Sequence, residues 1–215
     1  VTLTRLVRNE TAIEMALADS LGDAGEEIMG AVLFTDLWGF TGFAESHLPY
    51  DVIHALNLLF RHLGQAVDDH DGYVDKYIGD NLMAIFGLRG ESAETTCLNA
   101  VRAARDMLAR LPAVNRYLAD YLGGEFRLGI GIAHGPMVTG ELGFPLKRQF
   151  TAIGDTVNVA ARLESATRDT RADLLVSDSV VHNLPPEAIE LVSSHELALK
   201  GKTGTVLAHE ITVKN

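Results

Sequence analysis

The stretch Met29-Gly-Ala-Val-Leu-Phe-Thr-Asp36 decides the architecture of this chain. It is an uncharged, mostly apolar run that closes on an aspartate, which predicts a central, buried β-strand. A carboxylate at the end of such a strand can hold a hard cation, although Asp36 alone is equally well explained as a turn residue. The glycine-rich turn that follows brings backbone N–H groups within reach of an anion, so Phe40 and Thr41 are candidate substrate-binding residues.

Helices and strands alternate along the rest of the chain. The expected elements are a helix from Pro49 to about residue 70, a hairpin of strands 73–78 and 82–86, a helix over 92–111 closed by Pro112, a weaker helix to Leu122, a hairpin of strands 127–134 and 137–140 turning at Gly135-Pro136, a short strand over 150–153, a helix over 156–167 capped by Asp155, and strands over 174–177 and 206–212. This order predicts an α+β fold. Its core is a ferredoxin-like βαββαβ unit with a mixed or antiparallel sheet, helices packed on it and extra C-terminal strands.

The first residues differ in character from the rest. Residues 1–27 are expected to form an N-terminal helix and an acidic linker, and residues 28–215 to form one domain. Because the chain begins with Val1 rather than methionine, we expect it to be part of a longer protein with flanking regulatory domains.

The net charge, the hydropathy and the cysteine content limit the kinds of molecule that the chain is expected to bind and the compartment that suits it. The chain has 215 residues and a formal net charge of −11, so its overall field repels phosphate and argues against a general nucleic-acid surface. The sequence predicts no membrane contact from this segment, since no stretch is apolar enough to span a bilayer. Its single cysteine, Cys97, excludes an internal disulfide and suits a reducing compartment. We expect a cytoplasmic location, as a free protein or as the cytosolic domain of a larger or membrane-bound one.

Two aspartates are the candidate metal ligands. If the strands that precede Asp36 and Asp80 are neighbours, both carboxylates can share a site for two divalent cations, Mg²⁺ or Mn²⁺. Lys76 lies four residues before Asp80, about 13 Å along an extended strand, so the two cannot neutralise each other. Lys76 is therefore either an exposed strand-edge residue or a contact for another part of a ligand.

A second polar pair lies on the helix after Asp155. Asn158 and Arg162 stand at positions i and i+4, so they project together, and a guanidinium there can bind a phosphate. An exposed arginine that pairs with Glu164 or Ser165 is the plainer alternative. The glycines of Gly129-Ile-Gly-Ile-Ala-His-Gly135 have the wrong spacing for a dinucleotide loop.

Three segments together resemble the class III nucleotidyl cyclases. They are Val32–Thr41, Gly72–Asp80 and Phe150–Leu163, which occur in the order and spacing of that family within a match running from about Met29 to Glu210. The resemblance implies a sheet with helices on one side, and a head-to-tail homodimer with two active sites at the interface. On this basis residues 28–215 are a class III cyclase catalytic domain.

The resemblance also implies roles for individual residues. Asp36 and Asp80 match the metal-binding aspartates, and Lys76 with Thr151 matches the pair that recognises adenine from the other subunit. Asn158 matches the residue that orients the ribose, and Arg162 the one that stabilises the transition state. Lys200 resembles the lysine that contacts the triphosphate.

The implied reaction is that of an adenylate cyclase: the ribose 3′-hydroxyl of ATP attacks the α-phosphorus, giving 3′,5′-cyclic AMP and pyrophosphate. Many adenylate cyclases carry aspartate at the position of Thr151, whose hydroxyl can donate as well as accept a hydrogen bond. A guanylyl or dual-specificity cyclase, and a catalytically silent nucleotide-binding regulatory domain, are therefore the alternatives. Threonine at this position also resembles the bicarbonate-responsive subgroup, which makes bicarbonate a candidate regulator.

Overall fold

The structure is a computed structural model that describes residues 25–122, 125–144, 146–198 and 205–214. Within them the elements are β1 (Glu26–Trp38), α2 (Phe40–Ser46), α3 (Pro49–Asp68), β2 (Tyr73–Ile78), β3 (Asn81–Phe86), α4 (Ala93–Leu122), β4 (Arg127–Phe144), β5 (Lys147–Ile153), α5 (Asp155–Thr170), β6 (Leu174–Ser177), α6 (Asp178–Asn183), a 3₁₀ turn (Pro186–Ala188), β7 (Ile189–Ala198) and β8 (Thr205–Val213). Strand β1 begins at Glu26, inside the segment expected to be a linker. The predicted helix over the first residues lies outside the described residues.

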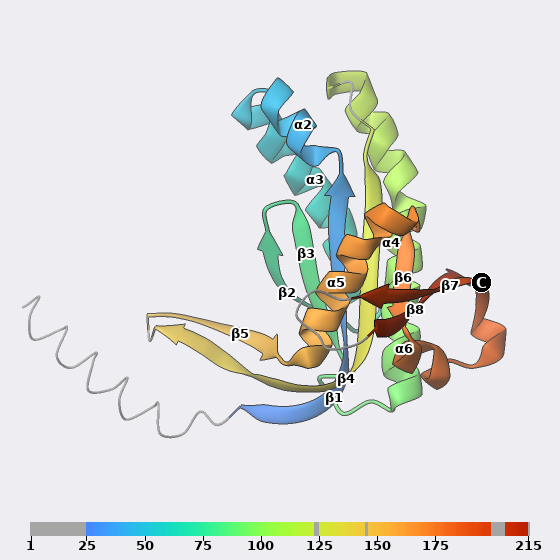
Figure 1. The fold of residues 1–215 in the computed structure, drawn as a ribbon. Coiled ribbons are helices and arrows are strands. Elements are labelled where there is room, and N and C mark those ends of the chain that lie inside the picture. Colours follow the sequence, from blue (N-terminus) through green and yellow to red (C-terminus); the bar gives the residue numbers. More distant parts are fainter. Residues whose placement is uncertain (1–24, 123–124, 145, 199–204, 215) are drawn as a thin grey trace, which may run out of the picture.

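The described strands form one mixed sheet in the order β2-β3-β1-β4-β6-β8-β7, with β5 paired to β4 (Figure 1). The first four strands have the order of a ferredoxin-like unit, with α2 and α3 connecting β1 to β2 and α4 connecting β3 to β4. The predicted α+β fold is confirmed. The central strand β1, which the opening stretch predicts, pairs antiparallel with both β3 and β4.

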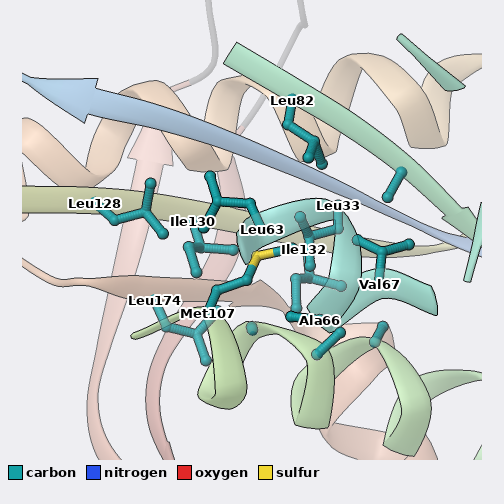
Figure 2. Close-up of a cluster of buried hydrophobic side chains, with 14 of the residues drawn as sticks. Leu33, Leu63, Ala66, Val67, Leu82, Met107, Leu128, Ile130, Ile132 and Leu174 are labelled. Atoms are coloured by element: carbon teal, nitrogen blue, oxygen red, sulfur yellow. The ribbon is translucent and has the colours of Figure 1, made fainter. Parts of the chain in front are cut away.

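Alternation along β1 divides the interior into two layers. Ala31, Leu33 and Leu37 face the cluster formed with α3 and α4, whereas Val32 and Phe34 face the cluster formed with α5. Figure 2 shows part of the first layer, where Met107 of α4 lies among leucine and isoleucine side chains from the sheet. Helices therefore cover both faces, and the expectation of helices on one side is wrong. Asp36, with the parity of Val32 and Phe34, belongs to the α5 side.

Strand β4 runs without a break through the predicted turn at Gly135-Pro136, so the expected hairpin is wrong. Pro136 lies opposite Met29 in the ladder with β1, and its carbonyl oxygen accepts a hydrogen bond of 2.7 Å from the Thr156 hydroxyl. The N and O atoms of a strand residue point the same way, so the position where Pro136 lacks an N–H faces away from β1. On that side the pairing of β4 with β6 ends at Ile132 of β4, and its pairing with β5 begins at Val138 of β4.

Helix α4 continues past Pro112, where the sequence was expected to end it. Its buried residues Met107, Leu111, Val114 and Leu118 keep a 4-3-4 spacing across the proline, so one apolar face is packed on the core from end to end. Tertiary packing outweighs the local cost of the proline here.

The C-terminal half departs from the expected elements in smaller ways. Helix α5 begins at Asp155 with Gly154 as its N-cap and without a side-chain capping bond, so the predicted Asp155 cap is wrong. Strand β7 is absent from the sequence prediction and pairs with β8 at the sheet's edge. No helix among the described residues is both long and apolar enough to cross a membrane.

Candidate active site

Asp36 lies near the end of β1 and is 6% exposed. Its carboxylate accepts a charge-assisted hydrogen bond from Arg168, near the end of α5, so the two elements are tied across the sheet face. Sequence reasoning missed Arg168. The available signal was its i, i+4 spacing from Glu164, which places both on one side of the helix.

Asp80 occupies the turn between β2 and β3, after Gly79, whose φ of 64° is left-handed. The antiparallel register pairs Thr35 with Leu82, so the turn reaches the end of β1. There the backbone N–H of Leu37 donates to the Asp80 carboxylate, while burial raises the pKa of that carboxyl above its ordinary value. The structure thus brings Asp36 and Asp80 to one end of the sheet.

Glu164 of α5 adds a third acidic group to this end. It is 5% exposed, and burial, with a smaller contribution from the charge of Asp80, raises its pKa to about 7. A small cavity of about 190 Å³ lies here, lined by Asp36, Asn81, Glu164, Ser165 and Arg168.

Asp36, Asp80 and Glu164 together form the acidic end of the sheet. The chemistry of their side chains shows whether they suit the expected divalent cations. Burial raises the pKa of both Asp80 and Glu164, and a bound cation would oppose this shift by favouring the charged carboxylates. The described residues contain no group of three or more Asp, Glu, His or Cys side chains arranged around one ion. Two aspartates are nevertheless sufficient for Mg²⁺, which fills its shell with water and phosphate oxygens. The residues present therefore fit divalent cations held jointly with a phosphorylated ligand.

Lys76 and Thr151 meet between β2 and β5. The Lys76 ammonium donates to the Thr151 hydroxyl at 2.8 Å, and that hydroxyl donates to Asp75 Oδ2 at 2.6 Å. Asp75, whose side chain is fully buried, also lies 3.5 Å from the Lys76 Nζ and accepts from the Gln149 amide. Neither Asp75 nor Gln149 was predicted from the sequence.

A β-bulge in β2 makes this cluster possible. The ladder pairs Val74 with Ala84 and Lys76 with Met83, so Asp75 is an extra residue on β2. Neighbouring residues of a regular strand point to opposite faces, whereas here Asp75 and Lys76 both reach Thr151. Lys76 and Asp80 do not lie on one extended strand as expected, because β2 ends at Ile78 and Asp80 belongs to the turn.

Asn158 and Arg162 stand one turn apart on α5. Asn158 is exposed, while Arg162 is half-buried with a buried Nη1 that has no hydrogen-bond partner in the described structure. A buried donor of this kind is destabilising until an acceptor meets it. The geometry therefore leaves Arg162 with hydrogen-bonding capacity for an anionic ligand.

The remaining candidates lie on or near α2, or beyond the described residues. Phe40 and Thr41 open α2, one residue after the end of β1; Phe40 packs against Phe43 and Phe126, and Thr41 is exposed. Lys200 lies outside the described residues.

Comparison with known proteins supplies a family. The family described as "Adenylate and Guanylate cyclase catalytic domain" matches residues 26–212. An adenylate cyclase of Anabaena cylindrica is 34% identical over 84% of this chain, and adenylate cyclase 1 of Rhizobium meliloti is 36% identical over 69% of it. The chain spans 36% and 22% of those two relatives, so it corresponds to one part of longer proteins.

Solved structures show the same fold. The adenylyl cyclase CyaB of P. aeruginosa superposes with a TM-score of 0.81 at 23% identity, covering 89% of this chain and 97% of that one. The guanylyl cyclase Cya2 gives a TM-score of 0.79 at 24% identity, covering 87% and 93%. With its strand order, its paired aspartates and a family match over nearly the whole described chain, this protein belongs to the adenylate and guanylate cyclase catalytic domain family.

Proposed function

We propose that this chain is the catalytic domain of an adenylate cyclase, which converts ATP to 3′,5′-cyclic AMP and pyrophosphate. The observation that carries the proposal is the Lys76–Thr151 pair, because a lysine and a hydroxyl held 2.8 Å apart can contact N1 and the 6-amino group of adenine together. The adenylate cyclases of Anabaena cylindrica and Rhizobium meliloti named above support the same choice.

The chain's own residues position the substrate and meet its developing charge. Lys76 and Thr151 bind the base, Asn158 orients the ribose, and Lys200 with the start of α2 binds the triphosphate. Arg162 donates to the α-phosphate oxygens, where negative charge grows as the 3′-hydroxyl attacks. Divalent cations held by Asp36 and Asp80 would supply positive charge and make the 3′-hydroxyl more acidic.

We further propose that the active form is a homodimer, with Asp36 and Asp80 of one subunit facing Lys76 and Thr151 of the other. An exposed apolar surface around the Lys76–Thr151 pair supports a homodimer. Tyr73, Tyr77 and Ile78 of β2 are each at least 40% exposed, as are Leu142 and Phe144 of the β4–β5 hairpin. The cytoplasmic location, the flanking regulatory domains and bicarbonate as a regulator are also part of the proposal and rest on the sequence alone.

The decisive experiment incubates the purified chain with Mg²⁺ or Mn²⁺ and either ATP or GTP, and measures cyclic nucleotide and pyrophosphate. We expect cyclic AMP and pyrophosphate in equal amounts. A preference for GTP would overturn the base assignment, and binding without product would identify a silent regulatory domain.

A further inference from the structure

We propose that Asp75 is a specificity-positioning residue: it holds the Thr151 hydroxyl as a pure hydrogen-bond acceptor and so makes the site select a 6-amino over a 6-oxo purine. The inference rests on the proposed function, because it assumes that Thr151 faces position 6 of the base. It concerns how the choice between ATP and GTP is made.

The direction of each hydrogen bond follows from the chemistry of the partners. An ammonium group has no lone pair to accept with, so Lys76 must donate to the Thr151 oxygen. A carboxylate has no proton to give, so the contact of 2.6 Å with Asp75 uses the single proton of the hydroxyl. What remains on the Thr151 oxygen is one lone pair.

This remaining lone pair discriminates between purines. The 6-amino group of adenine donates to it, whereas the 6-oxo group of guanine presents a second acceptor and is repelled. A free threonine could rotate its hydroxyl and serve either base, but the buried carboxylate of Asp75 removes that freedom. A site with fixed polar groups rejects a mismatched ligand far more strongly than an adaptable one.

The carboxylate is itself held in place. Its Oδ1 lies 3.5 Å from the Lys76 Nζ and 3.3 Å from the Gln149 Nε2, and the same amide donates to the Asp75 carbonyl oxygen at 3.0 Å. Oδ1 therefore faces two donors, and Oδ2 is left for Thr151.

This arrangement predicts what Asp75→Asn does. The amide oxygen stays with the donors of Lys76 and Gln149, so the new amide nitrogen takes the place of Oδ2 and donates to Thr151. The Thr151 hydroxyl can then rotate so that its O–H points at the ligand. Thr151 becomes a donor instead of an acceptor, and the penalty on a 6-oxo group is removed.

The test uses two ligands of matched size that differ only in the atom at position 6. N6-methyl-ATP carries an N–H donor there, and 6-methoxypurine riboside triphosphate carries an oxygen acceptor. We expect the wild-type chain to bind the former more tightly by on the order of tenfold or more, and Asp75→Asn to lose that preference. The wild-type measurement needs no variant, so it tests the inference even if the substituted chain fails to fold.

Two controls isolate the contact. Asp71→Asn removes the same charge from an exposed position just before β2, and should leave the ratio of affinities unchanged. In a Thr151→Val background, Asp75→Asn should have no further effect on the ratio, because no hydroxyl remains to be oriented.

The outcomes separate the two proposals. Equal wild-type affinity for the matched ligands, or an unchanged ratio in a folded Asp75→Asn variant, overturns the role of Asp75 even if the chain makes cyclic AMP. A chain that binds the matched ligands unequally, as expected, but cyclises neither ATP nor GTP supports that role and overturns the proposed enzyme. A chain that binds no nucleotide overturns both.

Discussion

Arg162 illustrates how a single side chain is left ready for a ligand. Its Nη1 is buried and has no hydrogen-bond partner among the described residues, although the helix around it is well packed. An unmet buried donor is a local instability that a growing negative charge would relieve. Its greatest effect should therefore come at the transition state rather than in the bound substrate.

Replacing this side chain should separate turnover from binding. We expect Arg162→Ala to reduce kcat by on the order of 10²–10³-fold while KM for ATP changes only a few-fold. Steady-state kinetics on the variant tests this, with Arg89→Ala as the exposed control. Equal losses in affinity and turnover would contradict the assigned role.

Glu164 predicts a pH dependence of stability. Its folded pKa of about 7 lies above the ordinary value of 4.5, so between these values the folded chain binds more protons than the unfolded chain. The contribution of Glu164 to stability is therefore fully present below about pH 4.5 and is lost as the pH rises through 7.

Glu164→Gln, which stays neutral at every pH, should remove this contribution. Thermal unfolding in EDTA should show a smaller fall in Tm between pH 5 and pH 8 for Glu164→Gln than for the wild type. Glu190→Gln, at an exposed position of β7, should behave as the wild type does. An identical fall in all three chains would show that Glu164 ionises normally.

The candidate site could be predicted from sequence where a residue type and a strand end coincide. Asp36 was found in this way, Asp80 as a turn residue that could pair with it, Lys76 from its position before Asp80, and Thr151 only through the family resemblance; the structure brings them together as two pairs. Their functional roles remain predictions. Asp75 was missed because a bulge changes which face a side chain points to, and Arg168 because its partner lies 132 residues away. A register shift has no local sequence signal, and the i, i+4 spacing of Arg168 from Glu164 marks a helix face without identifying Asp36 as the partner.

Helix α5 depends on glycine in the strand beneath it. Gly129 and Gly131 alternate with Ile130 and Ile132 along β4, so the isoleucines fill the α3–α4 layer and the glycines face α5. A Cβ at Gly131 would overlap the backbone of Ala160 and Glu164. The glycine-rich stretch that failed as a dinucleotide loop is therefore a contact surface for the helix carrying Asn158 and Arg162.

A methyl group at this contact should loosen the helix. We expect Gly131→Ala to lower the free energy of unfolding by about 1–3 kcal/mol, as overpacking of a closed interior does. Urea denaturation measures the change. Gly42→Ala in α2 is the control, because a Cβ there meets nothing within 4 Å and should leave stability unchanged or slightly raised. Equal stability of the Gly131 variant and the wild type would show that α5 can shift freely.

The elements themselves were predictable where one signal dominates. The apolar run of β1 and the turn at Asp80 both gave correct elements. The errors came where proline was taken to end a helix or to make a turn. Pro112 lies inside a helix whose apolar face packs on the core, and Pro136 lies in a strand at a point where no neighbouring strand needs a hydrogen bond from its nitrogen. Strand β7 was missed because it is defined by its pairing with β8, which lies later in the chain.

At the scale of the whole molecule, each chain carries both halves of the proposed site, and in the proposed homodimer the two halves of one chain contribute to two different active sites. If the subunits pair head to tail, a chain with Asp36→Asn and a chain with Lys76→Ala are each defective alone. Mixed dimers rebuild one intact site from the unaltered half of each subunit.

Mixing the two defective chains should therefore restore activity. With random exchange, half of the dimers are mixed and each has one intact site, so we expect about a quarter of the wild-type rate. Assays after co-refolding at equal concentrations measure this, and each variant mixed with itself is the control. Failure to recover activity from a sample that sediments as mixed dimers would show that each chain builds its site unaided.

The bulge at Asp75 has a consequence for how such proteins diverge. It lies in β2, at the outer border of the sheet, whereas the acidic end is built on β1 at its centre. If Asp75 sets the choice of base, substitutions that change this choice fall on a different strand from the acidic end, and a lineage could exchange one purine for another while its phosphate chemistry stays intact.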